Sequence, residues 1–387
     1  MKKLKFMLAL AFAFCLCACD SSESIPQETN LISNYTEENH YTCGKNVTWD
    51  FDETTATLTI SGTDEMQDFG YGSYGCIPLS APWVNLQADI KTVVIENGVT
   101  TIGNLAFDKC TALESITIPD SVTKIGSDAF RSCTALQSVM IPEHVTEIGD
   151  WAFDECTALE SITIPEHVTR IADTAFLKCS ALQAIHVAEN NQNYSSENGV
   201  LFDKNKTILI TFPLQNSQIE YTIPESVTEI EAFAFYENSV LKSITIPEHI
   251  KSIDDNMFFR CSALETVVIP DSVTEIGDSA FSECSSLKSI IIPDSVTYIG
   301  DETFSKCTAL ESITIPESVT YLGIDDFLGC SALQSLTFNC NLYTQITYHD
   351  TDDYLISNKI TIYGSKDSIA ESYAEAYHAT YICLDET

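Results

Sequence analysis

Cysteine has the greatest potential for chemistry in this chain, since its thiolate is both a nucleophile and a metal ligand. The sequence holds 15 cysteines in 387 residues. Eight of them recur at one position of a 23-residue period, and in one further copy that position holds asparagine. The nine positions are Cys110, Cys133, Cys156, Cys179, Asn238, Cys261, Cys284, Cys307 and Cys330.

Neither a metal site nor a set of disulfides fits these eight cysteines. No C-x-x-C motif and no paired histidine accompanies them, as a zinc site would require. If successive copies stack as strands about 4.8 Å apart, their Cβ atoms lie beyond the roughly 3.8 Å that a bridge prefers. Cysteine and asparagine share a small size and the ability to hydrogen-bond the backbone. We therefore interpret the nine positions as a structural ladder at a buried corner.

Other motifs that could carry chemistry are incomplete. Residues 70–75 match G-x-G-x-x-G, but two prolines follow where a dinucleotide site needs a helix, so we interpret them as a connecting loop. Residues 350–353 lack the glycine and distal glutamate of a calcium loop. His144, His167 and His249 stand where other copies have serine, which indicates exposed corners, with a pH-sensitive or metal-binding patch as the alternative. We expect no catalytic residue, no metal and no cofactor.

The elements that must position these residues are copies of a 23-residue unit, clearest at 108–130. The unit ends in phenylalanine in nine copies, and one spacing of 59 residues instead of 23 marks an insertion of 36. A fixed period of this size is typical of a solenoid, in which stacking of the units supplies the core. The nine phenylalanines are Phe107, Phe130, Phe153, Phe176, Phe235, Phe258, Phe281, Phe304 and Phe327.

Within the unit, the spacing of apolar residues predicts two short strands. Leu113, Ile116 and Ile118 are expected to point into the core, and a corner with proline ends this strand because proline gives no N–H to a ladder. Gly126 would permit the next bend. Residues 127–130 are then expected to form a helical or 3₁₀ turn that directs the phenylalanine inward.

The strand pattern L-x-x-I-x-I-P, in copies that begin at Leu113, Leu159, Leu287 and Leu310, resembles the leucine-rich repeat of the BspA type (TpLRR). The resemblance covers about residues 41–385 and implies a β-rich repeat solenoid of a bacterial surface protein. One position departs from the ordinary leucine-rich repeat. The usual asparagine or cysteine after the strand is replaced by residues such as Ser121.

The N-terminus predicts export and a lipid anchor. Three lysines precede an apolar run at residues 6–17, which is typical of a signal peptide over residues 1–18. Leu16-Cys17-Ala18-Cys19 resembles a bacterial lipobox, which implies cleavage before Cys19 and diacylglycerol on its thiol; a plain signal peptide is the alternative. Residues 19–40 are polar and indicate a flexible tether. We expect a protein that is lipid-anchored at the cell envelope and exposed at the surface.

The repeats at 84–338 are expected to lie between two caps, at 41–83 and 339–387. The first cap alternates as a β-hairpin over 47–51 and 56–60, and the second predicts a last strand at 360–363 and an amphipathic helix at 367–378. A hairpin within the insertion at about 188–221, with strands at 199–203 and 207–212, either continues the stack or forms a lateral binding element. Each cap holds a cysteine pair that an oxidising compartment would allow to bridge, a point left open. The pairs are Cys43 with Cys76 and Cys340 with Cys383.

The net charge narrows the choice of partners. It is −37, and becomes −40 once a leader with three lysines and no acidic residue is removed. A surface this acidic argues against binding of nucleic acid and against docking on anionic lipids. Membrane contact would therefore be through the lipid anchor only. Any protein partner would need to be basic, or the contact bridged by calcium.

Positions that vary between copies are candidates for a binding surface. The outward residues of the first strand are mostly serine and threonine, interrupted by larger side chains. At the second corner, Tyr298 and Tyr321 should be stacked neighbours, and exposed aromatic residues are common in binding sites, although two tyrosines can also simply pack on each other. The candidates are Met140, His186, Val268, Ile291, Tyr298 and Tyr321.

These features favour a non-enzymatic surface protein that presents an extended sheet. The family resemblance implies adhesion to host or neighbouring-cell proteins. Glycan capture for nutrient uptake and a passive envelope spacer are the alternatives.

Overall fold

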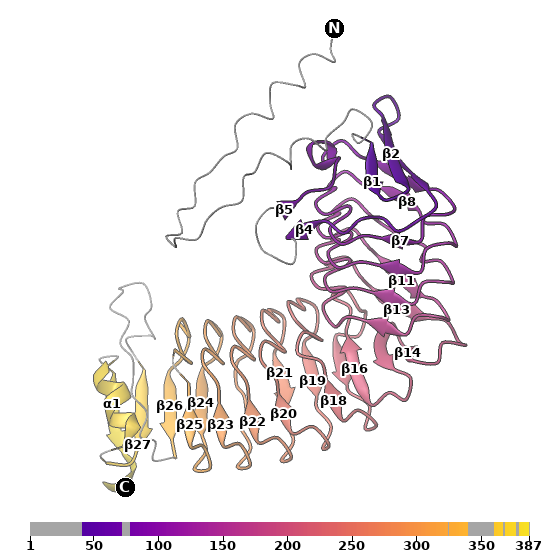
Figure 1. Ribbon diagram of the computed structural model, residues 1–387. Helices are drawn as coiled ribbons and strands as arrows, with labels where there is room; N and C mark the ends of the chain where they lie inside the picture. The colour runs from indigo at the N-terminus through magenta and orange to yellow at the C-terminus, as the bar shows by residue number, and fades with distance from the viewer. Residues whose placement is uncertain are drawn as a thin grey trace, which may run out of the picture. The chain divides into compact units, whose positions relative to one another are not determined.

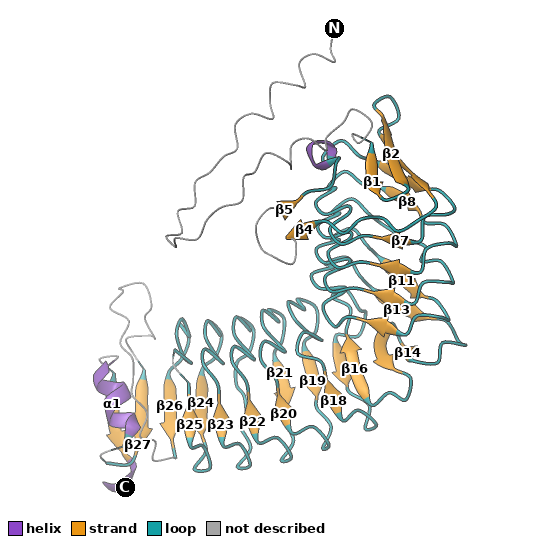
Figure 2. Ribbon diagram, in the orientation of Figure 1, coloured by secondary structure: helices purple, strands orange, loops and turns teal. Residues whose placement is uncertain are grey.

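The computed structural model describes residues 41–71, 78–323, 325–339, 360–366, 368–376 and 379–386. It is a β-solenoid with a period of about 23 residues, and in Figure 1 its turns follow one another side by side. Nearly all regular structure is strand, joined by tight loops (Figure 2). The predicted signal peptide and tether, and residues 72–77 and 340–359, therefore lie outside the described part, and with them Cys19, Cys76, Cys340 and residues 350–353.

The longer strand of a turn belongs to what we call the first sheet, in which residues of consecutive repeats pair in parallel at a spacing of 23, as Ile162 does with Ile185, while β26 pairs with β27 at a spacing of 26. Ile162 and Ile164 are buried while Ser161 and Thr163 are exposed, as the two-residue alternation of a strand requires. The first-sheet strands are β6 (Thr92–Ile95), β8 (Ser115–Thr117), β11 (Ser161–Ile164), β13 (Ala184–Val187), β17 (Glu220–Thr222), β19 (Ser243–Thr245), β21 (Thr266–Val268), β24 (Ser312–Ile315), β26 (Ser335–Phe338) and β27 (Thr361–Gly364).

A second sheet of two-residue strands lies after the proline corner. Its first residue points outward and its second inward, as Glu147 and the fully buried Ile148 do. Pairing is again parallel, with Lys124 opposite Glu147 and Glu147 opposite Arg170. The strands are β7 (Thr101–Ile102), β9 (Lys124–Ile125), β10 (Glu147–Ile148), β12 (Arg170–Ile171), β18 (Glu229–Ile230), β20 (Ser252–Ile253), β22 (Glu275–Ile276), β23 (Tyr298–Ile299) and β25 (Tyr321–Leu322).

Three details of the turn differ from the sequence-based expectation. Residues 127–130 form no helical turn, because Asp128 has φ of 55°, in the left-handed region. Gly126 is needed for a close approach instead of a bend, since a Cβ there would lie 2.7 Å from the backbone nitrogen of Asn104. Ile116 and Ile118 are only partly buried, although both pack against the core.

The core is a column of stacked aromatic rings. Phe107 and Phe130 have ring centroids 5.4 Å apart, and the spacing between later neighbours stays similar, with 6.0 Å between Phe304 and Phe327. Trp83, which the sequence placed only in the cap, heads the column 5.7 Å from Phe107. Each fully buried aromatic side chain contributes about 1.5–3 kcal/mol through the hydrophobic effect, so the column is a main source of stability.

The insertion is built into the stack. The predicted hairpin is present as β15 (Val200–Asp203) and β16 (Ile208–Thr211), and a further strand, β14 (Tyr194–Glu197), precedes it. β16 pairs in parallel with β18, so it serves as a second-sheet strand. Leu201 packs into the core of the preceding turns, while Phe202 packs into that of the following turns. We call β15 and β16 the wall, because they divide the hydrophobic core in two.

The described residues at the two ends of the solenoid form hairpins, strands and one helix. The N-terminal hairpin is β2 (Val47–Asp52) with β3 (Thr57–Gly62), flanked by β1 (Thr42–Gly44); β4 (Gly70–Tyr71) and β5 (Pro78–Leu79) pair beside a 3₁₀ turn at Val84–Leu86. At the other end the helix α1 spans Ile369–Ala376 and buries Ile369 and Tyr373. The strand at 360–363 was predicted to be last, but β28 (Thr380–Cys383) pairs with it beyond the helix, before a 3₁₀ turn at Leu384–Glu386.

Candidate binding surfaces

The cysteine positions form one buried column. From Cys133 onward each thiol donates a hydrogen bond to the phenylalanine carbonyl 26 residues earlier, as Cys156 does to Phe130 at 3.2 Å. Asn238 makes the equivalent contact, because its Nδ2 donates to the Pro213 carbonyl at 3.4 Å. Burial raises the pKa of the Cys156 thiol to about 12. These thiols are therefore protonated at neutral pH and shielded from reagents.

The cysteines of the caps are unbridged where they are described. Cys43 is buried and free, and Cys383 is partly buried and free. The partners that the sequence allowed for them, Cys76 and Cys340, lie outside the described residues. Within the described ranges no group of three histidine, cysteine or acidic side chains is placed to hold a metal ion. His144 and His167 stack with ring centroids 6.2 Å apart, and no third potential ligand completes them there.

The candidate residues at the first-sheet position of their turns separate into two places, and Met140 and Ile291 lie in turns where no strand forms there. Val268 and Ile291 occupy the same position of consecutive turns, with 54% and 83% of their surface exposed. Met140, also 83% exposed, and the exposed His186 lie on the other side of the wall in sequence, two turns apart from each other. The structure therefore brings Val268 and Ile291 together and leaves Met140 isolated.

Tyr298 and Tyr321 lie side by side on the second sheet, as their spacing predicts. They pair in register between β23 and β25, with ring centroids 4.7 Å apart and planes within 6°. Each keeps 37% of its surface exposed. The Tyr321 hydroxyl donates to Asp301 Oδ1 at 3.3 Å. Partial burial and the carboxylates of Asp278 and Asp301 raise the pKa of Tyr298, so both rings lie in a negative environment.

The same outward column is electrically different before the wall. There Glu147 lies between Lys124, at 3.3 Å, and Arg170, which it also contacts. Although partial burial opposes the change, Arg170 and Lys124 hold the pKa of Glu147 below its usual value. In this half the column supplies basic partners for its one carboxylate.

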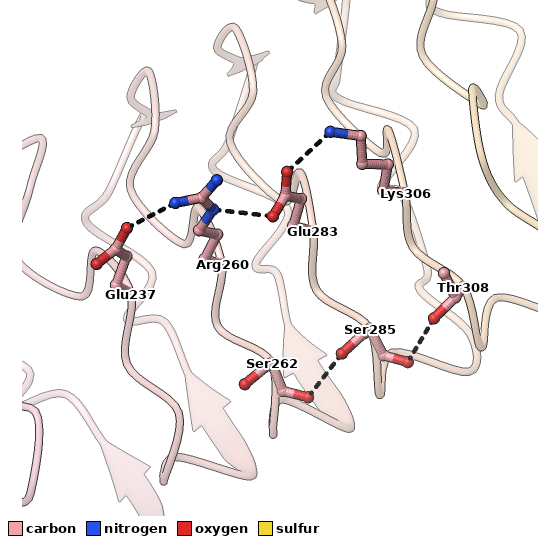
Figure 3. Close-up of a pocket in the computed structure, with 7 residues that line it drawn as sticks. All are labelled: Glu237, Arg260, Ser262, Glu283, Ser285, Lys306 and Thr308. Atoms are coloured by element: carbon pink, nitrogen blue, oxygen red, sulfur yellow. Dashed lines mark hydrogen bonds and ion pairs between the residues drawn. The ribbon is translucent and has the colours of Figure 1, made fainter. Parts of the chain in front are cut away.

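A further surface was missed by the sequence analysis. A shallow pocket of about 580 Å³ lies along a third side of the turns. Four charged side chains of successive turns alternate in sign along it (Figure 3). Glu237 accepts from Arg260 Nη1 at 3.0 Å, Arg260 Nε donates to Glu283 at 2.8 Å, and Lys306 lies 2.9 Å from Glu283. The signal was available, since acidic and basic residues alternate there at 23-residue spacing.

We interpret this charged row as a structural feature and not as a site for chemistry. Each of its four side chains is bound to a neighbour of opposite charge, and Ser262, Ser285 and Thr308 line the pocket beside them. The hydroxyl of Ser285 donates to the Ser262 carbonyl at 3.3 Å, and that of Thr308 to the Ser285 carbonyl at the same distance. The pocket is thus a surface ladder that links successive turns.

No helix among the described residues is long and apolar enough to cross a membrane.

Comparison with known proteins agrees with this architecture. The sequence profile of the BspA type leucine rich repeat region (6 copies) matches residues 85–208, 210–334 and 251–373. No curated protein sequence matches the chain.

Three solved bacterial proteins have similar structures. A leucine-rich repeat protein from Eubacterium ventriosum is 26% identical, with a TM-score of 0.56, over 84% of this chain and 86% of that one. A leucine rich cell surface protein from Faecalibacterium prausnitzii is 29% identical, with a TM-score of 0.56, over 77% of this chain and 94% of that one. The pneumococcal vaccine antigen PcpA is 19% identical, with a TM-score of 0.60, over 89% of this chain and 98% of that one, and shows the shared fold.

Proposed function

Because the chain belongs to the BspA-type leucine-rich repeat family, we propose that it is a non-enzymatic cell-surface protein whose solenoid binds an extracellular protein of a host or neighbouring cell. The observation that carries the proposal is the exposed, stacked pair of Tyr298 and Tyr321. Tyrosine is enriched at protein interfaces because its ring is large and rigid and its hydroxyl can hydrogen-bond. The exposed Val268 and Ile291 add apolar area on the first sheet.

A surface location is supported by the similarity to a protein described as a leucine rich cell surface protein, which is 29% identical. Attachment through a lipid on Cys19 is the second part of the proposal, and the acidic surface makes a covalent tether the natural means of staying at a membrane. Replacing Cys19 by Ala should release the chain from the membrane fraction and abolish incorporation of labelled palmitate. Membrane retention without the label would instead indicate an uncleaved signal peptide.

Glycan capture is the second candidate. A sugar ring packs readily against exposed aromatic side chains, and the tyrosine pair supplies them. A passive spacer is the third, and would use none of the exposed side chains.

One screen separates the three. The full-length chain is tested against immobilised extracellular-matrix proteins and a glycan array, with and without calcium and at two salt concentrations. Saturable protein binding that Tyr298→Leu or Tyr321→Leu weakens supports the proposal. Tyr41→Leu is the matched control, since Tyr41 is 55% exposed at the other end of the solenoid. Glycan binding alone would replace the proposal with the second candidate, and no binding would favour a spacer.

A further inference from the structure

The outward column of the second sheet reads differently on the two sides of the wall. Before the wall it runs Thr101, Lys124, Glu147, Arg170 along successive strands. After it the column runs Ser252, Glu275, Tyr298, Tyr321. The backbone pairing is the same, so the two runs can be compared position by position.

Glu147 and Glu275 are equivalent in this comparison, but only one is neutralised. Glu147 has a basic side chain on the strand before it and another on the strand after it. Glu275 is exposed and lies between Ser252 and Tyr298, and no lysine, arginine or histidine of the described residues pairs with it. The Ser252 hydroxyl donates to Asp254 instead.

Further carboxylates are held in a row beside the tyrosines. Asp255 Oδ1 accepts the backbone N–H of Asp278 at 2.8 Å, and Asp278 Oδ1 accepts that of Asp301 at 2.8 Å. These bonds fix each carboxylate on its turn, about 4.8 Å from the next. The negative charge beside Tyr298 is therefore part of the framework.

We propose that this place receives an arginine side chain from the partner protein, stacked on Tyr298 and paired with Glu275. One face of Tyr298 is covered by Tyr321. Its other face is turned toward the strand of Glu275, the next residue of the column. A guanidinium is flat, stacks on aromatic faces and pairs with carboxylates, so it satisfies both neighbours at once, as Arg170 satisfies Glu147.

A second copy of this chain does not supply that side chain. The chain has three arginines, Arg131, Arg170 and Arg260. Each is already bound to one or two carboxylates of its own turn or of adjacent turns. The partner is therefore a different protein with an exposed basic segment. This inference rests on the binding role proposed above and adds the chemistry of the partner to it.

The test uses the full-length chain and a fluorescent decapeptide in which arginine alternates with serine, titrated by anisotropy. A peptide with citrulline in place of arginine keeps the shape and removes the charge. We expect Tyr298→Leu to weaken binding of the arginine peptide roughly tenfold and Glu275→Gln by a similar factor. Glu229→Gln, which removes one charge from the same column two turns away, should change it less than twofold.

The most specific variant adds a positive charge next to Glu275. Ser252→Lys places a lysine next to Glu275 as Lys124 lies next to Glu147. The new lysine should pair with the Glu275 carboxylate and weaken binding of the arginine peptide several-fold. Thermal unfolding of each variant shows that the fold is retained. Equal affinity for the citrulline peptide, or arginine binding unchanged by Tyr298→Leu and Glu275→Gln, would overturn the inference.

The two proposals fail separately. If Tyr298→Leu or Tyr321→Leu weakens binding of an extracellular protein but Glu275→Gln and Ser252→Lys leave its affinity unchanged, the surface function stands and the arginine site does not. If the arginine peptide binds at Tyr298 and no extracellular protein binds, the arginine site stands and the surface function does not.

Discussion

The thiol of Cys156 donates a hydrogen bond to the carbonyl of Phe130, 3.2 Å away, and thereby joins one turn to the turn before it. The contact recurs along the column, with Cys284 bound to Phe258 and Cys330 to Phe304. The thiol is the second donor to each of these buried carbonyls, since each also accepts a backbone N–H, as Phe130 does from Cys133 at 3.1 Å. Its role is to complete the hydrogen bonding of the core.

We predict that Cys284→Ala destabilises the protein by about 1–3 kcal/mol, because the Phe258 carbonyl keeps only the backbone N–H of Cys261 as donor and the fully buried thiol leaves a cavity. Denaturant unfolding followed by circular dichroism measures the change. Cys383→Ala, at a partly buried thiol in the C-terminal cap, is the control and should have a smaller effect. A loss below 0.5 kcal/mol at Cys284, on the order of a neutral surface change, would contradict this role for the thiol.

Ser279→Gly should stabilise the protein. Ser279 has φ of 54°, a conformation that costs a non-glycine residue about 1–2 kcal/mol. Glycine adopts it freely, and Gly329 already has φ of 73° in another turn. The predicted gain is about 1 kcal/mol in unfolding free energy, after the greater flexibility of unfolded glycine is taken into account. Ser279→Ala is the matched control, since it removes the hydroxyl and keeps the strain; an equal gain there would point to another cause.

Asp154 gives a prediction about pH. Burial, with a carboxyl oxygen that has no hydrogen-bond partner, raises its pKa from the ordinary 3.8 to about 6. The folded state therefore holds a proton that the unfolded state has released, and its contribution to stability is lost as pH rises from 3.8 to about 6. Asp154→Asn removes this loss, so the variant should gain about 1–3 kcal/mol on the wild type across that window and keep the difference above it.

The measurement is chemical unfolding of both proteins at intervals between pH 3.5 and 7. A stability difference that does not change with pH would show that Asp154 titrates normally. Asp326, which is 1% exposed and has one unbonded oxygen, has its pKa raised by burial in the same direction. Asp326→Asn should therefore shift the pH profile with the same sign.

The wall leads to a prediction about where stability is lost. Leu201 and Phe202 are adjacent and both fully buried, yet they pack into different cores. Leu201→Ala should cost about 2–5 kcal/mol and Phe202→Ala about 3–5 kcal/mol. Hydrogen exchange should show the first variant loosening the turns before the wall and the second the turns after it. Equal loss of protection on both sides in both variants would mean that the solenoid unfolds as one unit.

Much of the fold could be predicted from the sequence, because a 23-residue repeat states the same packing many times over. The solenoid and its family are confirmed. Trp83 was missed at the head of the ring column because it lies 24 residues before Phe107, one position out of period. Phe212 was missed because it was assigned to a hairpin strand, although it lies 23 residues before Phe235 and contacts it at 5.2 Å.

The binding surface was predicted less completely. The spacing placed Tyr298 beside Tyr321, but the difference between Glu147 and Glu275 depends on which side chains flank each one in three dimensions. The left-handed turns carried no signal at all, since residues such as Asp128 and Ser279 stand where glycine would have marked them.

The wall also limits how such a molecule can change length. Within either run of turns, each unit offers the next the same face, as Glu147 pairs with Lys124 before it and Arg170 after it. A gene duplication or deletion of one whole repeat there would leave the backbone pairing of the remaining turns intact. At the wall Leu201 and Phe202 face unlike neighbours, so the same event would leave both without a partner. The length of the solenoid can therefore change by whole repeats on either side of the wall, whereas the wall itself must be kept.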